Sequence, residues 1–379
     1  MKCYLDNAAT TKLSLEMKDY LISVLDVFGN PSSAHSEGVR SNTLIETVRD
    51  RTAKFINAES SDNIYFTSSG SASNTLGIQG FCLDNKYTTI LYSPTVHKSI
   101  LKTIYNLSKH HNIDAGMLEV DSKGNIDTNH LKYAMQTGCY RKLVVVDYAN
   151  SELGTIQNIK EIANIVHPRG SYTGNKLFVD CTGSISSIPL DVSGLNIDMA
   201  SFSAHKIGAL KGVGVLYKKE NIEIVPLIFG SQEQGLFGGT ENLLGILSLG
   251  KAIELIKYDK TSRNRDYVWD SIKDMSDISL VGASLDENRL INNLYICIKG
   301  VNGNDVVAMM DDVYKTQVST GSACNNGTSL PSPTALAIGL SEEDANSCIR
   351  ISFSGNETEE ELQAFCKNLC TCVEMLKSF

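Results

Sequence analysis

The sequence lacks several features that mark large classes of protein. It has no stretch approaching about 18 consecutive apolar residues, so no membrane-spanning helix is expected. It has no run of five or more like charges, and 34 Lys and Arg residues stand against 43 Asp and Glu residues, a net charge of −9. We therefore expect neither direct binding of nucleic acid nor a basic patch for a membrane surface.

The ten cysteines also lack a recognisable pattern. They are scattered without the paired CxxC spacing of a zinc site, so neither a metal site nor a disulfide framework is predicted. The N-terminus, MKCYLDNAATTK, has no apolar stretch of the kind found in signal peptides. We expect a cytoplasmic protein with free thiols, one of which could have a chemical role.

Short apolar runs alternate with helical patterns through the first two thirds of the chain. With 379 residues, of which 42% are apolar, there is material for a large core. Continuous apolar runs are typical of parallel strands that are covered by helices on both faces. Strands are predicted at 63–66, 89–92, 143–147, 177–180, 199–202 and 213–217, and helices at 41–56, 71–82 and 242–258.

The composition changes after the helix predicted at 242–258. A more polar helix within 259–277 is expected to lead to a second unit, with strands at 294–298 and 349–352 and helices at 304–311 and 357–377. We predict a large α/β domain over 12–257 and a small α+β domain formed by 1–11 and 258–379. The polar segments 28–38 and 319–334 are expected to be loops.

Two charged residues follow apolar runs, at the sheet edge where open α/β proteins bind ligands. Lys206, in SFSAHK (201–206), carries an amine that can form a Schiff base when it is partly desolvated. Asp180 ends the run FVD, and an anion there could keep the ring nitrogen of pyridoxal phosphate protonated. Taken alone, Lys206 could equally be a surface loop lysine, and Asp180 a turn or cap residue.

Two more segments follow predicted strands. TSSGSAS (67–73) lies between a strand and a helix, which is the geometry of a phosphate cradle and also of a plain helix cap. His97, in SPTVHK (93–98), could stack on a cofactor ring or move protons, or could simply begin a surface helix.

An ordered series of motifs resembles the cysteine desulfurases, the sulfur-mobilising branch of the class V aminotransferase-like, fold-type I pyridoxal phosphate enzymes. These motifs are YLDNAATT (4–11), GNPSSAH (29–35), ELGTIQ (152–157), SAHK (203–206), GTEN (239–242) and GSAC (321–324). The resemblance runs nearly from end to end of the chain. It implies the PLP-dependent transferase fold of type I, with a mainly parallel, seven-stranded type of sheet in the large domain and a smaller α+β domain.

The resemblance also implies the cofactor, pyridoxal 5′-phosphate, and the residues that hold it. Lys206 would bind the cofactor covalently, Asp180 would pair with the ring nitrogen, and His97 would stack on the ring. Thr240 would reach the phosphate of a partner subunit, so a homodimer is implied. The other residues expected around the phosphate and the ring are Gly70, Ser71, Ser203, His205, Asn150 and Ser151.

The reaction implied by the resemblance is the conversion of L-cysteine to L-alanine. Arg350 would clamp the substrate carboxylate, with Asn30 also binding substrate, although Arg350 could instead form a structural ion pair. Lys206 would move the Cα proton. Cys324, expected on an exposed and mobile loop, would attack the substrate sulfur and keep it as a persulfide, with His97 as the nearest proton acceptor.

Several positions depart from the family pattern, among them Gln234 and Phe237, where two arginines are expected. Gly183 replaces a glutamine, Ser151 an asparagine, and Ala72 an acidic residue. We expect Gly183 to leave a gap beside the ring that water or a larger substrate could fill. The alternative functions are a selenocysteine lyase or another β-elimination or transamination of a small amino acid, and a low-activity sulfur-transfer scaffold. A sulfur acceptor protein, for example in iron–sulfur cluster assembly, is the partner expected besides L-cysteine.

Overall fold

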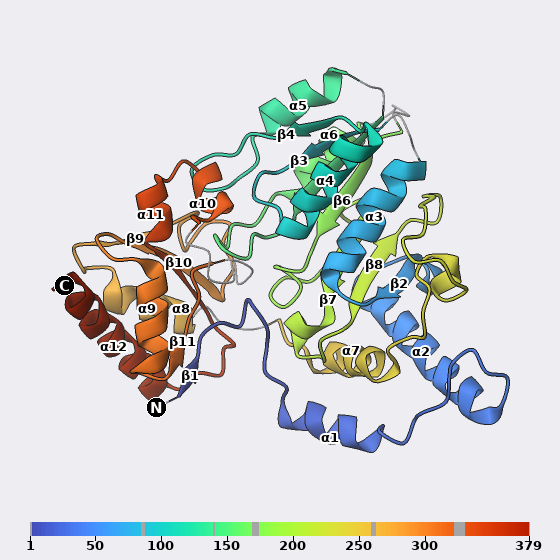
Figure 1. Cartoon of the computed structure of the whole chain (residues 1–379), viewed down its shortest axis with the longest axis horizontal. Coiled ribbons are helices and arrows are strands. Elements are labelled where there is room, and N and C mark those ends of the chain that lie inside the picture. Colours follow the sequence, from blue (N-terminus) through green and yellow to red (C-terminus); the bar gives the residue numbers. More distant parts are fainter. Residues whose placement is uncertain are drawn as a thin grey trace.

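The computed structural model describes residues 2–84, 88–138, 141–168, 174–258, 263–321 and 330–378. Two units lie side by side (Figure 1), one built on a seven-stranded sheet and the other on a three-stranded and a two-stranded sheet. Cys324, and with it the loop that we predict to be mobile, lies outside the described residues.

The central sheet has the strand order β2-β8-β7-β6-β5-β3-β4 and is mainly parallel, with only β8 antiparallel to its neighbours β7 and β2. All six predicted strands of this unit are confirmed to within one or two residues. The three-residue strand β4 was not predicted, because its sequence AGM has no β-branched residue. The strands are β2 (Ile64–Thr67), β3 (Thr88–Tyr92), β4 (Ala115–Met117), β5 (Arg141–Asp147), β6 (Lys176–Asp180), β7 (Met199–Ser203) and β8 (Gly214–Lys218).

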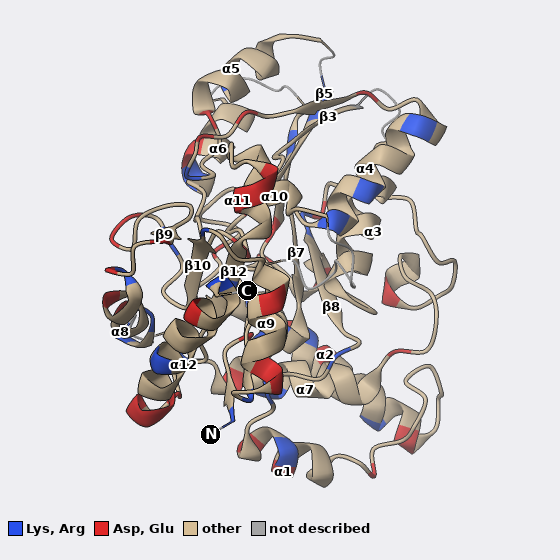
Figure 2. Ribbon diagram, turned by 60° about the vertical axis from the view of Figure 1, so that its left-hand side comes forward, with Lys and Arg blue, Asp and Glu red and all other residues tan. Residues whose placement is uncertain are grey.

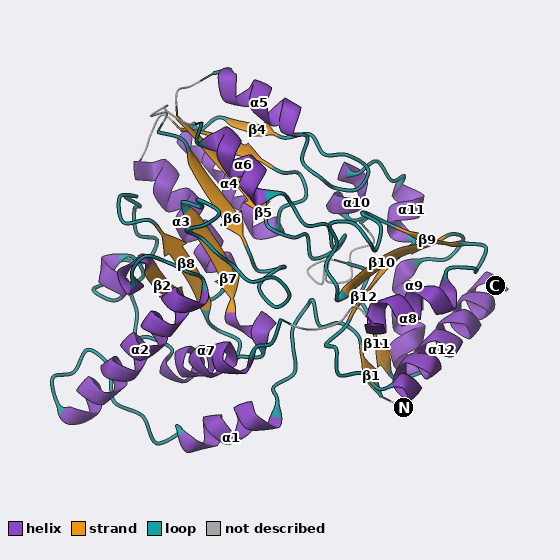
Figure 3. Ribbon diagram, turned by 180° about the vertical axis from the view of Figure 1, so that it is seen from behind, coloured by secondary structure: helices purple, strands orange, loops and turns teal. Residues whose placement is uncertain are grey.

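Helices cover both faces of this sheet (Figure 3). The strand side chains alternate between two cores: in β5, Leu143 and Val145 join one apolar cluster, while Val144 and Val146 join the other. This burial on both sides explains the continuous apolar runs in the sequence. The first cluster contains α3 (Gly70–Asp84) and α4 (Lys98–His111), and the second contains α2 (Ser36–Phe55), α5 (Thr128–Gln136), α6 (Ile159–Val166) and α7 (Leu243–Leu255).

The smaller unit has its own core. Its antiparallel sheet has the order β12-β10-β9, and the N-terminal strand β1 pairs in parallel with β11. Leu5 belongs to the same apolar cluster as Phe365, so both ends of the chain contribute to this core. The strands are β1 (Cys3–Tyr4), β9 (Ile278–Leu280), β10 (Asn293–Ile298), β11 (Thr316–Gln317) and β12 (Cys348–Ser352). The helices are α8 (Arg263–Ile272), α9 (Gly303–Asp312), α10 (Pro333–Ala337), α11 (Glu342–Asn346) and α12 (Glu359–Lys377).

This core agrees with the predicted discontinuous domain, whose boundaries at 11/12 and 257/258 stay a prediction. Both α11 and α12 begin with three acidic residues (Figure 2), which stabilise the positive end of each helix. The remaining elements are α1 (Leu15–Ser23) and the short 3₁₀ turns η1 (Ser61–Asn63), η2 (Ala204–Ile207) and η3 (Glu233–Gly235).

Capping residues correct three of the predicted boundaries. The loop predicted at 28–38 ends at His35, whose Nδ1 accepts the Gly38 N–H and starts α2. The loop predicted at 319–334 ends at Ser332, which caps α10. The last helix begins after Thr358, which forms a capping box with Glu361, two residues later than predicted.

In the part of the chain that the structure describes, no helix is both long enough and apolar enough to cross a bilayer. The same residues contain no cluster of His, Cys, Asp and Glu that could hold a metal ion. Eight cysteines fall within the described ranges and all are free thiols, as predicted, with Cys370 half-buried and the others buried.

Candidate active site

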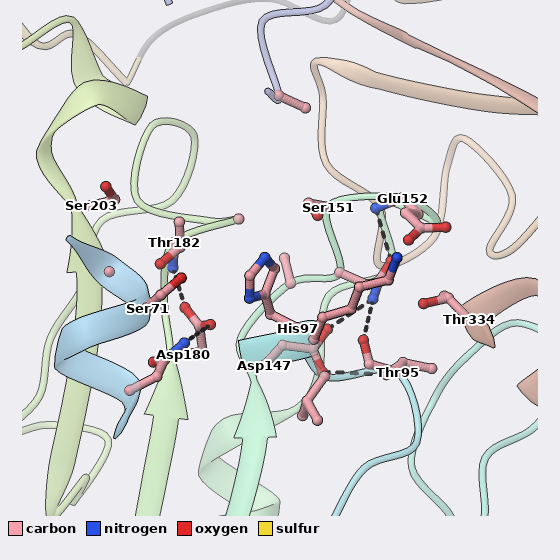
Figure 4. Close-up of a pocket in the computed structure, with 18 of the residues that line it drawn as sticks. Ser71, Thr95, His97, Asp147, Ser151, Glu152, Asp180, Thr182, Ser203 and Thr334 are labelled. Atoms are coloured by element: carbon pink, nitrogen blue, oxygen red, sulfur yellow. Dashed lines mark hydrogen bonds between the residues drawn. The ribbon is translucent and has the colours of Figure 1, made fainter. Parts of the chain in front are cut away.

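A cavity of about 300 Å³ lies at the carboxyl edge of the central sheet and includes Arg350 of the smaller unit in its wall. Figure 4 shows the side chains that converge on it. Neither Asn30 nor Thr240 is part of this wall, and Cys324 is outside the described residues. Ten of the predicted site residues do line the cavity: Gly70, Ser71, His97, Asn150, Ser151, Asp180, Ser203, His205, Lys206 and Arg350.

Three neighbouring strands supply polar residues to one side of this edge. Asp147, Asp180 and Ser203 are the last residues of the adjacent strands β5, β6 and β7. In each strand, an apolar residue two or four positions before this last residue belongs to the apolar cluster that includes α3 and α4. Because strand side chains alternate, all three polar side chains point to that same face. The parallel order thus gathers residues that are far apart in the sequence.

Asp180 is held rigidly in the cavity wall. Its carboxylate is 4% exposed, and its Oδ2 accepts a hydrogen bond of 2.8 Å from Asn74 Nδ2. Its Oδ1 accepts the Thr182 N–H at 2.9 Å. Asn74 is itself fixed by the hydroxyl of Ser201. The two donors therefore fix the orientation of the carboxyl group and leave lone pairs for a protonated ring nitrogen.

The first turn of α3 forms a cradle that depends on two glycines. A Cβ on Gly214 would lie 2.2 Å from Ser69 O, so β8 can pass this turn only without a side chain. A Cβ on Gly70 would lie 3.2 Å from Ser203 Cβ, which brings the turn close to the end of β7. The N–H groups of a first helical turn have no partners within the helix, and they attract anions.

His205 adds a neutral ring to this region. Burial and the nearby Lys206 and Lys211 lower the pKa of His205 to about 4, so the imidazole is uncharged at neutral pH. Its Nδ1 lies 3.0 Å from Thr10 Oγ1. Lys206, on η2, donates from Nζ to Ala8 O and, at 3.0 Å, to Ala9 O. The predicted lysine therefore lies on the cavity wall, and its amine reaches the N-terminal segment.

His97 both begins a helix and lines the cavity, so both predicted interpretations describe its position. It is the N-cap of α4, where its Nδ1 accepts the Ser99 N–H at 3.1 Å. Nδ1 is then unprotonated, and the proton of the neutral ring is on Nε2. The open face of the ring adjoins the cavity, while surrounding protein atoms desolvate the imidazole and lower its pKa. A neutral ring with an Nε2–H donor suits stacking.

Arg350 forms a structural ion pair, one of its two predicted roles, and it also lines the cavity, as the other role of binding a substrate carboxylate requires. Its side chain is 3% exposed, and Nη2 forms the structural ion pair, at 2.7 Å from Asp6 Oδ1. Nη1 donates to Ser151 O at 3.1 Å. Nε is buried and has no hydrogen-bond partner among the described residues. Each terminal nitrogen has a second N–H, so the guanidinium in the cavity wall keeps donors for a substrate carboxylate.

Asn150 shapes the turn after β5. Its Oδ1 accepts the N–H groups of Glu152 and Leu153 at 2.9 and 2.8 Å, and its Nδ2 donates to Thr95 O at 2.8 Å. These bonds hold the backbone around Ser151 against the loop that follows β3. Direct contact between the Asn150 side chain and a cofactor stays a prediction.

The prediction that Gly183 leaves a gap in place of a glutamine side chain is wrong. A Cβ added to Gly183 would lie 2.4 Å from Ala149 O and 3.4 Å from Ser151 N. The backbone of residues 149–151 occupies the space into which a glutamine side chain would begin to extend. The glycine is therefore required by the close approach of two loops. Gly183 itself lines the cavity, but it opens no extra room in the direction in which a side chain would extend.

Several residues of the site were not singled out from the sequence. Asn74 and Thr182 orient Asp180, and nothing in their local sequence marks that contact. Asp147 also lines the cavity. The signal that pointed to Asp180, an apolar strand ending in a carboxylate, is equally present at Asp147 and could have found it.

The arrangement fits pyridoxal 5′-phosphate. The structure offers a lysine amine, a buried carboxylate for a ring nitrogen, a neutral imidazole for a ring face and a helix N-terminus for a phosphate. The guanidinium of Arg350 in the cavity wall adds donors for the carboxylate of an amino acid. These are the groups that such a cofactor and its substrate require.

Comparisons with known proteins agree with this geometry. The aminotransferase class-V family matches residues 3–365. A cysteine desulfurase IscS from Dictyoglomus turgidum is 36% identical over 386 residues, covering 99% of this chain and 95% of that protein. Cysteine desulfurase IscS 1 from Archaeoglobus fulgidus is 32% identical and covers 99% of this chain and 98% of that protein.

Solved structures are similar over the same length. A NifS-like protein has a TM-score of 0.88 at 28% identity, with 100% of both chains covered. A NifS-like protein from Rickettsia africae has a TM-score of 0.87 at 31% identity, covering 99% of this chain and 100% of that one. SspA in complex with cysteine has a TM-score of 0.81 at 29% identity, covering 94% of this chain and 100% of that one. From the family match, these relatives and the cavity, we conclude that the chain belongs to the class-V aminotransferase family and, within it, to the cysteine desulfurases.

Proposed function

We propose that this protein is a pyridoxal-phosphate-dependent cysteine desulfurase that converts L-cysteine to L-alanine and receives the sulfur on Cys324. The observation that carries the proposal is a single cavity lined by Lys206, Asp180, His97 and Arg350 at the N-terminus of α3. A scaffold without turnover has no need for that combination of amine, carboxylate, imidazole and guanidinium.

The residues that would hold the cofactor are Lys206 at its carbonyl carbon, Asp180 at its ring nitrogen and the first turn of α3 at its phosphate. When bound, the cofactor supplies an electron sink that stabilises negative charge at the substrate Cα. His97 presents the face of a neutral ring to the same space. Asp180, fixed by its two hydrogen bonds, would present its carboxyl group to the ring nitrogen.

The chain's own groups account for the remaining steps. Arg350, which lines the cavity, donates hydrogen bonds to the substrate carboxylate and so orients the amino acid. The amine of Lys206 takes the Cα proton and later returns a proton to the product.

Cys324 follows Gly321, which lines the cavity, by three residues, and three residues span at most ~11 Å. Its thiolate attacks the substrate sulfur: the S–S bond forms as the Cβ–S bond breaks. The balance is L-cysteine plus a thiol giving L-alanine plus a persulfide, and no external oxidant is needed.

A homodimer and a sulfur acceptor are part of the proposal. Thr240 and Asn30 are both exposed and lie outside the cavity of their own chain. This position supports a role for their two loops in contacting a second copy of the chain. The persulfide must pass to an acceptor, which we take to be a protein, as in iron–sulfur cluster assembly. The free thiols support a cytoplasmic location.

The test uses the purified chain incubated with pyridoxal phosphate. We expect a visible absorption band from the bound cofactor, and equal amounts of alanine and protein-bound persulfide when L-cysteine is added. Cys324→Ala should keep the band and lose the persulfide. The control Cys370→Ala, at a half-buried thiol on α12, should behave as wild type.

Two outcomes would contradict the proposal. If the protein stays colourless after incubation with pyridoxal phosphate, it does not bind the cofactor as proposed. Undiminished alanine production by Cys324→Ala would point instead to a lyase or to another β-elimination, in which the thiol has no part.

A further inference from the structure

A second carboxyl group stands beside Asp180 in the cavity wall. Asp147 and Asp180 end neighbouring parallel strands and are directly paired in register. Both side chains are buried, at 6% and 4% exposure, and both line the cavity. Because adjacent strands lie about 4.8 Å apart, the two carboxyl groups are close neighbours in a poorly solvated place.

Asp147 also connects the two loops that frame the cavity. Its Oδ1 accepts a hydrogen bond of 3.3 Å from Thr95 Oγ1, and its Oδ2 accepts one of 3.1 Å from Asn150 Nδ2. Figure 4 shows Thr95 and Asp147 next to each other below the ring of His97. Thr95 precedes His97 by two residues, and Asn150 precedes Ser151. A change at Asp147 therefore reaches two residues that border the cofactor site.

The charge of Asp147 has no cationic partner in the described part of the chain, where no ion pair includes it. Burial raises the pKa of Asp147 to about 6, and Asp180 adds to that rise, while the bonds from Asn150 and Thr95 oppose it. Asp147 is therefore mainly ionised at neutral pH, beside the carboxyl group of Asp180. The other titratable groups that line this cavity are Asp180, His97, Lys98, Glu152, His205, Lys206 and Arg350.

We propose that Asp147 is a positioning residue of the cofactor site, a second carboxylate that acts through Asp180 to favour a protonated ring and through Thr95 and Asn150 to hold the surrounding loops. This inference rests on the proposed function in that it assumes pyridoxal phosphate in the cavity. A buried negative charge near a bound cation stabilises the protonated form of that cation. Removing the charge weakens cofactor binding and lowers the pH at which the bound cofactor loses its proton.

The test measures the cofactor without any amino-acid substrate, so desulfurase turnover plays no part. Pyridoxal phosphate is titrated into wild type and Asp147→Asn to obtain its dissociation constant, and the visible band of the loaded protein is followed against pH. We expect a severalfold weaker affinity and a band midpoint lower by ~0.5 pH unit or more, the scale of one neighbouring unit charge in a partly solvated site. Asp147→Glu, which keeps the charge, should return the midpoint toward wild type.

Asp198→Asn is the matched control. Asp198 is a buried carboxylate that precedes β7 at the opposite end of the same sheet and is absent from the cavity wall. Asp198→Asn should lower the melting temperature of the protein and leave the pH midpoint of the cofactor band unchanged. If Asp147→Asn does not fold, Thr95→Val gives the second test, because losing one bond to the carboxylate should shift the midpoint in the same direction by less.

An unchanged midpoint and affinity in Asp147→Asn, or an unchanged midpoint in Thr95→Val where that variant is used, would overturn the inference. A shift of the same size in Asp198→Asn would also overturn it, since the effect would then follow from general destabilisation. If wild type itself binds no pyridoxal phosphate, the proposed function is what fails.

Discussion

Gly183 offers a sharp test of how closely the loops of the site are packed. An ideal Cβ at this position would be 2.4 Å from Ala149 O, whereas ordinary van der Waals contact begins at 3.4 Å, so one loop must move by 3.4 − 2.4 = 1.0 Å. The obstacle is backbone and cannot rotate away. Moreover, Asn150, which follows Ala149, donates hydrogen bonds from Nδ2 to Thr95 O and to the Asp147 carboxylate. We expect Gly183→Ala to destabilise the protein by ~1–3 kcal/mol, the usual cost of overpacking.

The effect on catalysis should exceed the effect on stability. A displacement of about 1 Å carries Ser151, and with it the carbonyl that accepts from Arg350, away from its place. Misplacement on this scale costs on the order of 10²-fold in rate. Urea unfolding of the cofactor-free protein gives the free energy of unfolding, and alanine formation from L-cysteine gives the rate.

Gly116→Ala is the control for the glycine substitution itself. Gly116 lies in β4, where an added Cβ would meet only Leu91 Cδ2, at 3.1 Å, the end of a flexible side chain. We expect a change of less than ~1 kcal/mol, with either sign, because alanine also restricts the unfolded chain. If Gly183→Ala is as stable and as active as Gly116→Ala, the close approach of the two loops is refuted.

Two further predictions concern buried guanidinium groups. Arg350→Lys should raise the KM for L-cysteine by ~10-fold or more and change kcat less, because an ammonium group cannot bind a carboxylate through two parallel N–H donors as a guanidinium can. Steady-state kinetics measures both, and an unchanged KM would contradict the assignment. Glu233→Gln should cost ~3 kcal/mol in urea unfolding, since buried Arg49 loses its buried partner at 2.7 Å and keeps only the exposed Glu46, at 3.2 Å, as an ion-pair partner among the described residues. Glu287→Gln, which breaks the exposed pair with Lys123, should cost far less than Glu233→Gln, and equal losses in the two variants would show that burial does not matter.

Much of the fold follows from local sequence patterns. An apolar run of four to six residues between Gly- or Ser-rich turns predicts a strand that is buried on both faces, and six such strands are present as predicted. The pattern fails where an element is short or where a cap decides its end. The strand AGM of β4 owes its existence to pairing with β3, and the start of α2 is set by His35.

The sequence by itself determined which residues end the strands at the ligand-binding edge, because an apolar run that stops at Asp180, or at Ser203 just before Lys206, leaves those polar groups at a carboxyl end. The order of motifs along the chain then determined the family. Only the tertiary structure decided which of these ends are neighbours. Strand order and register place Asp147 against Asp180, and β12 brings Arg350 to Asp6 across 344 positions of sequence. Pairing of this kind depends on the packing of whole elements, which no local pattern of side chains records.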